Sequence, residues 1–127
     1  MTTTISGSNG IVFPDLTSMQ TGQQAVKAWV NFNGVGTVAI RAGYNVASIT
    51  DTGTGNYTVN FTTAMPDANY AVGIGVAAGN GLGFSGQQNG NLDPNVAPAV
   101  GALALITSNS INGASVDFNF ITAIVSR

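Results

Sequence analysis

Few side chains in this sequence are suited to catalysis, and most of them are aspartates. The chain has 127 residues and contains no His, Cys or Glu, so the usual general bases, the thiol nucleophile and most zinc ligands are missing. Four aspartates adjoin Gly, Pro or Thr in predicted turns, where a carboxylate accepts hydrogen bonds from nearby backbone N–H groups. They are Asp15, Asp51, Asp67 and Asp93. We therefore predict turn caps and expect no catalytic residue, no cofactor and no metal ion.

The fifth aspartate, Asp117, differs because it lies inside the last predicted strand. We expect it to pair with Arg41 or Lys27 across strands, or to face solvent. Two short patterns do not change the prediction of a non-enzyme. The single Asp-Thr-Gly at residues 51–53 lacks the second copy of an aspartic protease, and the glycines of residues 79–83 lack a strand–loop–helix context for a dinucleotide.

Charge is scarce in this chain. Only 6% of the residues are charged while 44% are hydrophobic, and the net charge is −2. Three cations cannot form a basic patch, so we expect no nucleic-acid binding. The apolar runs at 97–106 and 118–125 are too short to span a bilayer, and the N-terminus lacks the pattern of a secretory signal. We expect a soluble protein whose surface is partly coated with Asn, Thr, Ser and Gln and partly buried between subunits.

The alternation of apolar and polar residues predicts that β-strands, joined by turns, position the candidate side chains. Side chains of a strand point to opposite faces in turn, so Ala28, Val30 and Phe32 form one apolar face, and residues 57, 59 and 61 form another. Gly-rich turns separate the runs, and the hairpin of residues 48–59 is the clearest element. Seven strands are predicted, at 26–33, 37–41, 46–51, 56–62, 70–78, 100–107 and 115–125. This pattern is typical of an all-β fold, a small antiparallel β-sandwich or jelly-roll-like barrel.

The last predicted strand is apolar on both faces. Val116, Phe118 and Phe120 share one face, and residues 121, 123 and 125 form a second apolar series. A strand of this kind is buried on both faces, as in the centre of a sandwich or along an oligomer axis. Arg127 is expected only to keep this end in solvent.

Two further segments are candidates for contact with partners. Residues 1–24 form a predicted extended arm that precedes the domain of residues 25–127, and its strand–turn–strand pattern is too short to be stable alone. The arm's candidate attachment residues are Ile5, Ile11, Val12 and Phe13. Residues 79–98 read as a long irregular loop, which is either a contact loop or an excursion packed on a neighbour through Phe84. The candidate contact residues of this loop are Leu82, Phe84, Gln87, Gln88, Asn89 and Leu92.

The aromatic residues allow two interpretations. Trp29, Tyr44, Tyr57 and Tyr70 all lie in or beside predicted strands. Exposed rings on a sheet can stack on sugars, whereas rings at strand positions usually pack in a core or between subunits. Because the sequence does not separate these alternatives, both remain open at this stage.

The block from Ala28 to Tyr70, about a third of the chain, resembles a segment that recurs in bacteriophage virion-surface proteins, especially tail fibres and their receptor-binding tips. The resemblance rests on the runs AWVNFNG, GTVAIRA, SITDTGTGNYTVNFT and AMPDANY. The run ISGSNGIVFPDL also resembles a short segment, ending in FPDG, that precedes or punctuates domains of phage fibres. Leu16 replaces the usual Gly there, so the turn at that position is expected to differ.

The resemblance implies a homotrimer on the virion surface, made in the cytoplasm of the host bacterium. Within the virion, the chain is expected to be a tail-fibre or fibre-tip module that binds the host surface, including its glycans. The alternative is a capsid decoration (cement) protein whose arm adds a strand to the shell. The third hypothesis is a free carbohydrate-binding module. Partners in the first two cases are copies of the chain and the tail or major capsid protein.

Overall fold

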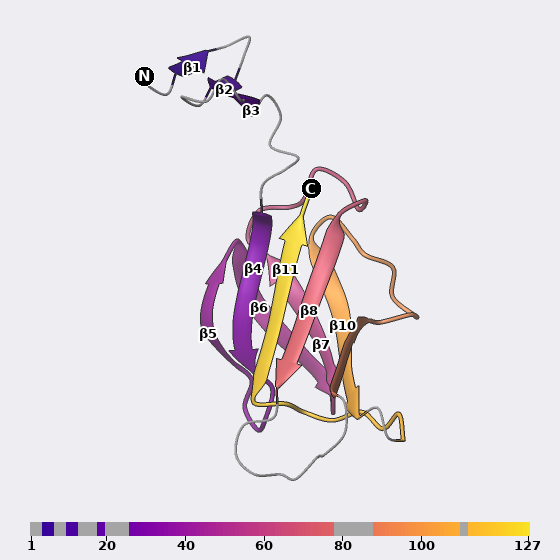
Figure 1. Cartoon of the computed structure of the whole chain (residues 1–127). Coiled ribbons are helices and arrows are strands. Elements are labelled where there is room, and N and C mark those ends of the chain that lie inside the picture. Colours follow the sequence, from indigo (N-terminus) through magenta and orange to yellow (C-terminus); the bar gives the residue numbers. More distant parts are fainter. Residues whose placement is uncertain (1–3, 7–9, 13–17, 20–25, 78–87, 110–111) are drawn as a thin grey trace.

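The computed structural model describes residues 4–6, 10–12, 18–19, 26–77, 88–109 and 112–127, and all regular secondary structure within them is β-strand. Eight of the strands form two four-stranded antiparallel sheets that face each other as a β-sandwich (Figure 1). These strands are β4 (Val26–Asn33), β5 (Ala39–Tyr44), β6 (Val46–Gly53), β7 (Asn56–Phe61), β8 (Ala71–Ala77), β9 (Gln88–Leu92), β10 (Ala102–Asn109) and β11 (Phe120–Ser126). The predicted all-β class and the two-sheet arrangement are confirmed.

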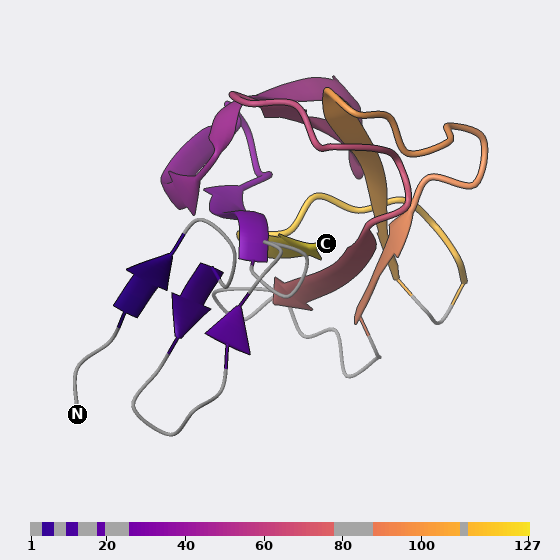
Figure 2. The same cartoon turned by 90° about the horizontal axis from the view of Figure 1, so that it is seen from above.

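One sheet has the order β5-β4-β11-β8 and the other the order β6-β7-β10-β9. The edge strands β5 and β6 are joined by the single residue Asn45, so the chain passes from one sheet to the other at that corner. On the opposite side β9 lies against β8, where a side chain at Gly90 would overlap Ile74. Seen along the strands, the two sheets therefore enclose a common interior (Figure 2).

That interior is filled by the faces that the alternation predicts. Ala28, Val30 and Phe32 of β4 are buried, as are Tyr57, Val59 and Phe61 of β7. From β10 and β11 come the further buried residues Leu103, Leu105, Thr107, Ile121, Ala123 and Val125. Burying one large apolar side chain contributes about 1.5–3 kcal/mol, so these four central strands supply most of the stabilisation of the fold.

Two predicted elements are wrong. Residues 88–92, expected in an irregular loop, form the edge strand β9, which pairs with β10 from Leu92↔Leu105 to Gln88↔Asn109. The last strand begins at Phe120 instead of residue 115. Its expected first residues leave the sheet because their backbone groups bond elsewhere: the N–H of Val116 donates to Thr107 at 3.1 Å, and the C=O of Phe118 accepts from Gly34 at 2.9 Å.

The N-terminal segment holds three short antiparallel strands, β1 (Thr4–Ser6), β2 (Gly10–Val12) and β3 (Ser18–Met19). They form a sheet of their own in the order β1-β2-β3, and Ile5 pairs directly with Ile11. Among the described strands, none of these three pairs with a strand of the sandwich. Phe13, the fourth candidate attachment residue, lies outside the described residues.

Candidate functional site

Three of the predicted turn-capping aspartates act as expected. The carboxylates of Asp51, Asp67 and Asp93 each accept a hydrogen bond from the backbone N–H two residues later, at 3.0, 2.7 and 2.8 Å. Asp15 lies outside the described residues. Within the described residues no group of three or more acidic, His or Cys side chains is placed to hold a metal ion.

Asp117 neither pairs with a cation nor faces solvent, which corrects both expectations. Its Oδ1 accepts a hydrogen bond from the Tyr57 hydroxyl at 2.6 Å and another from the N–H of Gly55 at 2.6 Å. Burial raises the pKa of Tyr57 well above its usual value of 10, and the bond to the Asp117 carboxylate raises it further. The ring of Tyr57 is enclosed in the core, so this hydrogen bond ties β7 to the segment that precedes β11.

Arg127 also differs from the expectation that it merely faces solvent. Its Nε donates to Oδ1 of Asp67 at 3.0 Å and its Nη2 to Oδ2 at 2.5 Å, a two-point contact that ties the end of the chain to the loop before β8. This guanidinium, together with the N–H of Asn69, holds the pKa of the Asp67 carboxyl below its usual value.

The predicted contact loop is divided by the structure. Gln88, Asn89 and Leu92 belong to β9, where Asn89 and Leu92 are exposed at the edge of the second sheet. Leu82, Phe84 and Gln87 lie outside the described residues. The structure therefore brings half of the candidate residues together on a regular edge strand, and the loop interpretation of those three is wrong.

The most apolar exposed surface lies on the sheet β5-β4-β11-β8, on the side away from the core. Tyr44, Trp29, Ile124 and Gly73 are paired in register across its four strands, and residues directly opposite one another share a face. The exposed fractions are 59% for Tyr44, 40% for Trp29 and 51% for Ile124, while Phe120 on the same side of β11 is 43% exposed. We call this surface the outer face.

Two other features define the shape of the outer face. The guanidinium of Arg41 lies over the Phe120 ring, 4.3 Å from its centroid, and its Nη1 donates to Asn31 at 3.4 Å. Along β8 the outward residues are Ala71, Gly73, Gly75 and Ala77, so this strand adds almost no side-chain height. The outer face is consequently a flat apolar strip beside aromatic side chains.

The outer side of the other sheet is different. Thr50, Thr58 and Ala104 stand in register there, and the amide of Asn60 donates to the hydroxyls of Ser48 and Thr50 at 3.0 and 2.9 Å. This side carries the Asn, Thr and Ser coat that the composition predicts. The two sides of one sandwich thus differ sharply in chemistry.

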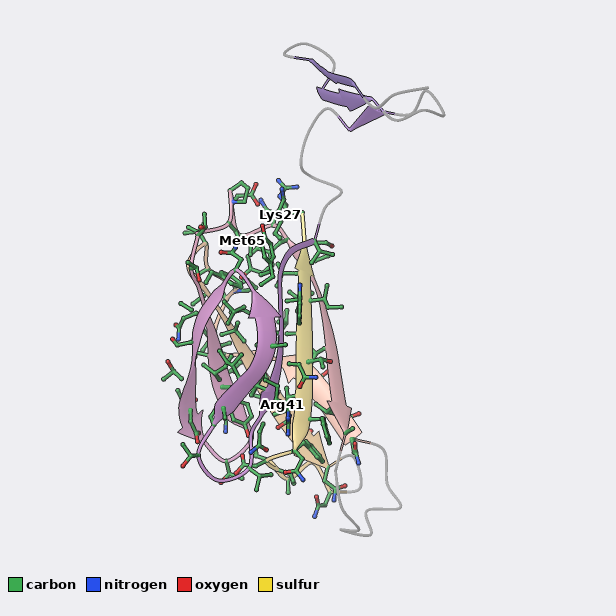
Figure 3. All side chains as sticks on the ribbon, turned by 90° about the vertical axis from the view of Figure 1, so that its left-hand side faces the viewer. Lys27, Arg41 and Met65 are labelled. Carbon is green, nitrogen blue, oxygen red and sulfur yellow. The ribbon has the colours of Figure 1, made fainter. Side chains whose placement is uncertain are left out.

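At the corner formed by Asn45, the surface is hollowed into a depression of about 460 Å³. It is lined by Lys27, Tyr44, Asn45, Thr62, Thr63, Ala64, Met65 and Pro66. Figure 3 shows Lys27 and Met65 close together at one end of the sandwich, with Arg41 well below them on the sheet. We call this hollow the corner depression.

Asn45 fixes the wall of the corner depression. Its φ of 55° is the left-handed conformation, which Asn tolerates better than most residues. Its Nδ2 donates to the C=O groups of Lys27 and Thr63, both at 3.0 Å, and its Oδ1 accepts from the N–H of Thr63 at 2.7 Å. The sequence interpretation missed this residue, because it ended the preceding strand at residue 41 and left residues 42–45 together between two predicted strands, whereas β5 continues to Tyr44.

The four aromatic residues Trp29, Tyr44, Tyr57 and Tyr70 differ in exposure: two are at least half-buried and two are exposed. Tyr57 is a core residue, and Tyr70 is half-buried with its hydroxyl donating to Ala99 at 3.0 Å. Trp29 and Tyr44 are exposed neighbours on the outer face. The core interpretation therefore applies to Tyr57 and Tyr70, and the structure places Trp29 and Tyr44 on the surface.

No protein-family model, curated protein or solved structure matches this chain. No helix in the described residues has the length and apolarity needed to cross a membrane.

Proposed function

We propose that the chain is a non-enzymatic structural protein of a bacteriophage virion, a tail-fibre or fibre-tip module that assembles as a homotrimer and attaches to the host surface. The outer face is the observation that carries this proposal. The resemblance of residues 28–70 to phage fibre proteins supports the virion context.

The outer face suits contact with another copy of the chain. Clustered exposed apolar side chains mark interaction sites on proteins. Here Trp29 and Ile124 form part of one row of the sheet and Phe120 stands beyond the row of Asn31 and Thr122, whereas the other sheet carries a polar coat. Ile124 and Phe120 project from the central strand β11, next to Gly73 and Gly75 of β8. Residues without side chains let a neighbouring backbone approach closely, which favours a close-packed subunit interface.

Capsid decoration is a second candidate, in which the separate sheet β1-β2-β3 would attach the subunit to the shell. Its strands have three, three and two residues, and a sheet of this size is not stable on its own in water. Edge strands offer unpaired N–H and C=O groups to a partner, and addition of a strand to a shell protein would satisfy them. A fibre subunit joined to the tail through the same strands would gain in the same way.

Antibody-gold labelling of intact phage particles tests the proposal. We expect gold at the tail, because a fibre module must reach the host. Gold spread over the shell would replace the fibre proposal by decoration. Particles without label would contradict both virion functions and leave a free carbohydrate-binding module as the remaining hypothesis. Antibody raised against the sandwich alone keeps the epitope away from the N-terminal strands, which either virion function would cover.

A further inference from the structure

The corner depression has the size of a ligand site and is held in shape by hydrogen bonds. Its volume of about 460 Å³ falls within the range of roughly 300–1,000 Å³ that small-molecule sites occupy. Asn45 joins its walls through the bonds to Lys27 and Thr63, and the N–H of Met65 donates to Val100 at 2.7 Å. The loop of residues 62–66 is therefore attached to both sheets, and the hollow is preformed.

Lys27 brings a positive charge to this hollow that no described carboxylate balances. Asp67 pairs with Arg127, and this contact is the one ion pair among the described residues. Asp117, which is half-buried, is engaged by Tyr57 and Gly55. Lys27 thus forms no ion pair with a described residue. Because an ammonium group forms its strongest hydrogen bonds with an anionic oxygen, Lys27 can bind the anionic group of a ligand.

The other lining groups are suited to a hydroxylated ring. Tyr44 is the most exposed of the large aromatic and aliphatic side chains named above, and it offers an apolar ring face beside the hydroxyls of Thr62 and Thr63. Both threonines are exposed, and their hydroxyls make no hydrogen bond to a described residue. A threonine hydroxyl can both donate and accept, which matches the hydroxyls of a sugar.

We propose that the corner depression binds an acidic sugar, with the carboxylate on the Lys27 ammonium, the ring on Tyr44 and the sugar hydroxyls on Thr62 and Thr63. A neutral sugar would leave Lys27 unpaired, and a simple anion would leave the ring and hydroxyls unused. The role of this sugar as a host receptor rests on the proposed function. The binding itself does not, because it depends only on the corner depression.

Titration of the purified protein with a galacturonic acid tetrasaccharide, followed by backbone amide NMR shifts, tests this site. We expect saturable shifts confined to residues around the depression, and affinity at least tenfold lower for the neutral galactose tetrasaccharide, because one charge-assisted hydrogen bond contributes about 1.5–3 kcal/mol. Sodium acetate at the same concentration should give much smaller shifts. Equal affinity for the neutral sugar, or no saturable binding of the acidic one, would overturn the proposal.

The matched variants are Lys27→Met and Arg41→Met. Each removes one cation from the same sheet, but only Lys27 lines the depression. Lys27→Met should lower the affinity for the acidic tetrasaccharide about tenfold and leave the weak neutral binding unchanged, while Arg41→Met should bind like the unaltered protein. An equal loss in both variants would show a general charge effect and contradict the site. Thr63→Val, which retains its backbone bonds to Asn45, should also weaken binding.

Failure of this inference and failure of the proposed function are distinguishable. Gold on the tail without binding of the acidic tetrasaccharide would preserve the fibre function and reject the sugar site. Binding by the purified protein without gold on particles would preserve the sugar site and reject the virion function.

Discussion

Replacing Gly55 by Ala is expected to lower the free energy of unfolding by about 3 kcal/mol or more. Gly55 has a φ of +68°, and an added Cβ would lie under 3.0 Å from two backbone atoms, the oxygen of Thr107 and the nitrogen of Val116. A left-handed conformation costs a residue with a side chain about 1–2 kcal/mol, and overpacking costs about 1–3 kcal/mol. Neither backbone atom can move cheaply, because the N–H of Val116 donates to the oxygen of Thr107 at 3.1 Å and the N–H of Thr107 donates to Gly55 at 2.7 Å.

Gly36→Ala separates the two contributions. Gly36 has nearly the same φ, +69°, but an added Cβ there meets nothing within 4 Å. Its substitution should therefore cost about 1 kcal/mol, the conformational part alone. Urea unfolding of the two variants measures the difference. Equal losses would show that the enclosure of Gly55 between Thr107 of β10 and residues 115–116 does not stabilise the fold.

Replacing Tyr57 by Phe is expected to cost about 2 kcal/mol at neutral pH. The hydroxyl donates to the Asp117 carboxylate at 2.6 Å and lies 3.2 Å from the oxygen of Gly34, so its removal leaves a charged acceptor with the Gly55 N–H alone. Hydrogen bonds to charged groups contribute about 1.5–3 kcal/mol. Tyr70→Phe is the matched control, because the Tyr70 hydroxyl donates only to neutral carbonyl groups and its loss should cost about 1 kcal/mol.

The same substitution should change how stability depends on alkaline pH. The pKa of Tyr57 is raised in the folded chain, first by burial and then by Asp117, so the unfolded chain loses the phenolic proton near pH 10 while the folded chain keeps it. The contribution of Tyr57 to the free energy of unfolding is therefore fully present below pH 10 and falls by about 1.4 kcal/mol per pH unit above it. In Tyr57→Phe this contribution disappears. Unfolding curves from pH 8 to 11.5 should show a shallower alkaline loss for the variant, and identical slopes would contradict the burial of the phenol.

Strand positions were predictable because their signal is local. The alternation in residues 26–33 and 56–61 follows from the two-residue period of a strand, and the buried set of β4 and β7 matches it residue by residue. The hairpin of β6 and β7 was equally clear, because two glycines mark its turn. In the structure both of them, Gly53 and Gly55, adopt positive φ.

The errors arose where distant residues decide the structure. Gln88–Leu92 is a polar segment without alternation, and it becomes a strand only because β10 offers it an edge. Residues 115–119 have a strand-like pattern, yet Thr107 and Gly34 withdraw them from the sheet. The partner of Asp117 could not be found from sequence, because Tyr57 is 60 residues away and its ring reaches the carboxylate through the core.

Only part of the candidate sites was visible in the sequence. The exposed aromatic residues were identified as a group, but pairing of Trp29 with Tyr44 depends on the register of β4 and β5. The corner depression brings together residues from three segments of the chain, 27, 44–45 and 62–66, and no local pattern connects them. The apolar series of residues 121, 123 and 125 in β11 was predicted and is buried, whereas the exposure of Phe120 and Ile124 on the opposite face of the strand became evident only from the structure.

The central claim is that the part of the outer face on β11 and β8 is covered by other copies of the chain, while Tyr44 on the edge strand β5 stays exposed at the corner depression. Sedimentation equilibrium tests this claim most directly. The unaltered protein should have three times the 12.8-kDa chain mass. Ile124→Asp should reduce the mass to that of one chain, because a carboxylate buried between subunits is strongly unfavourable. Thr58→Asp, which places the same charge at the middle of the polar side, should leave the trimer intact. A monomeric unaltered protein, or an Ile124→Asp variant that keeps the mass of the unaltered protein, would contradict the account.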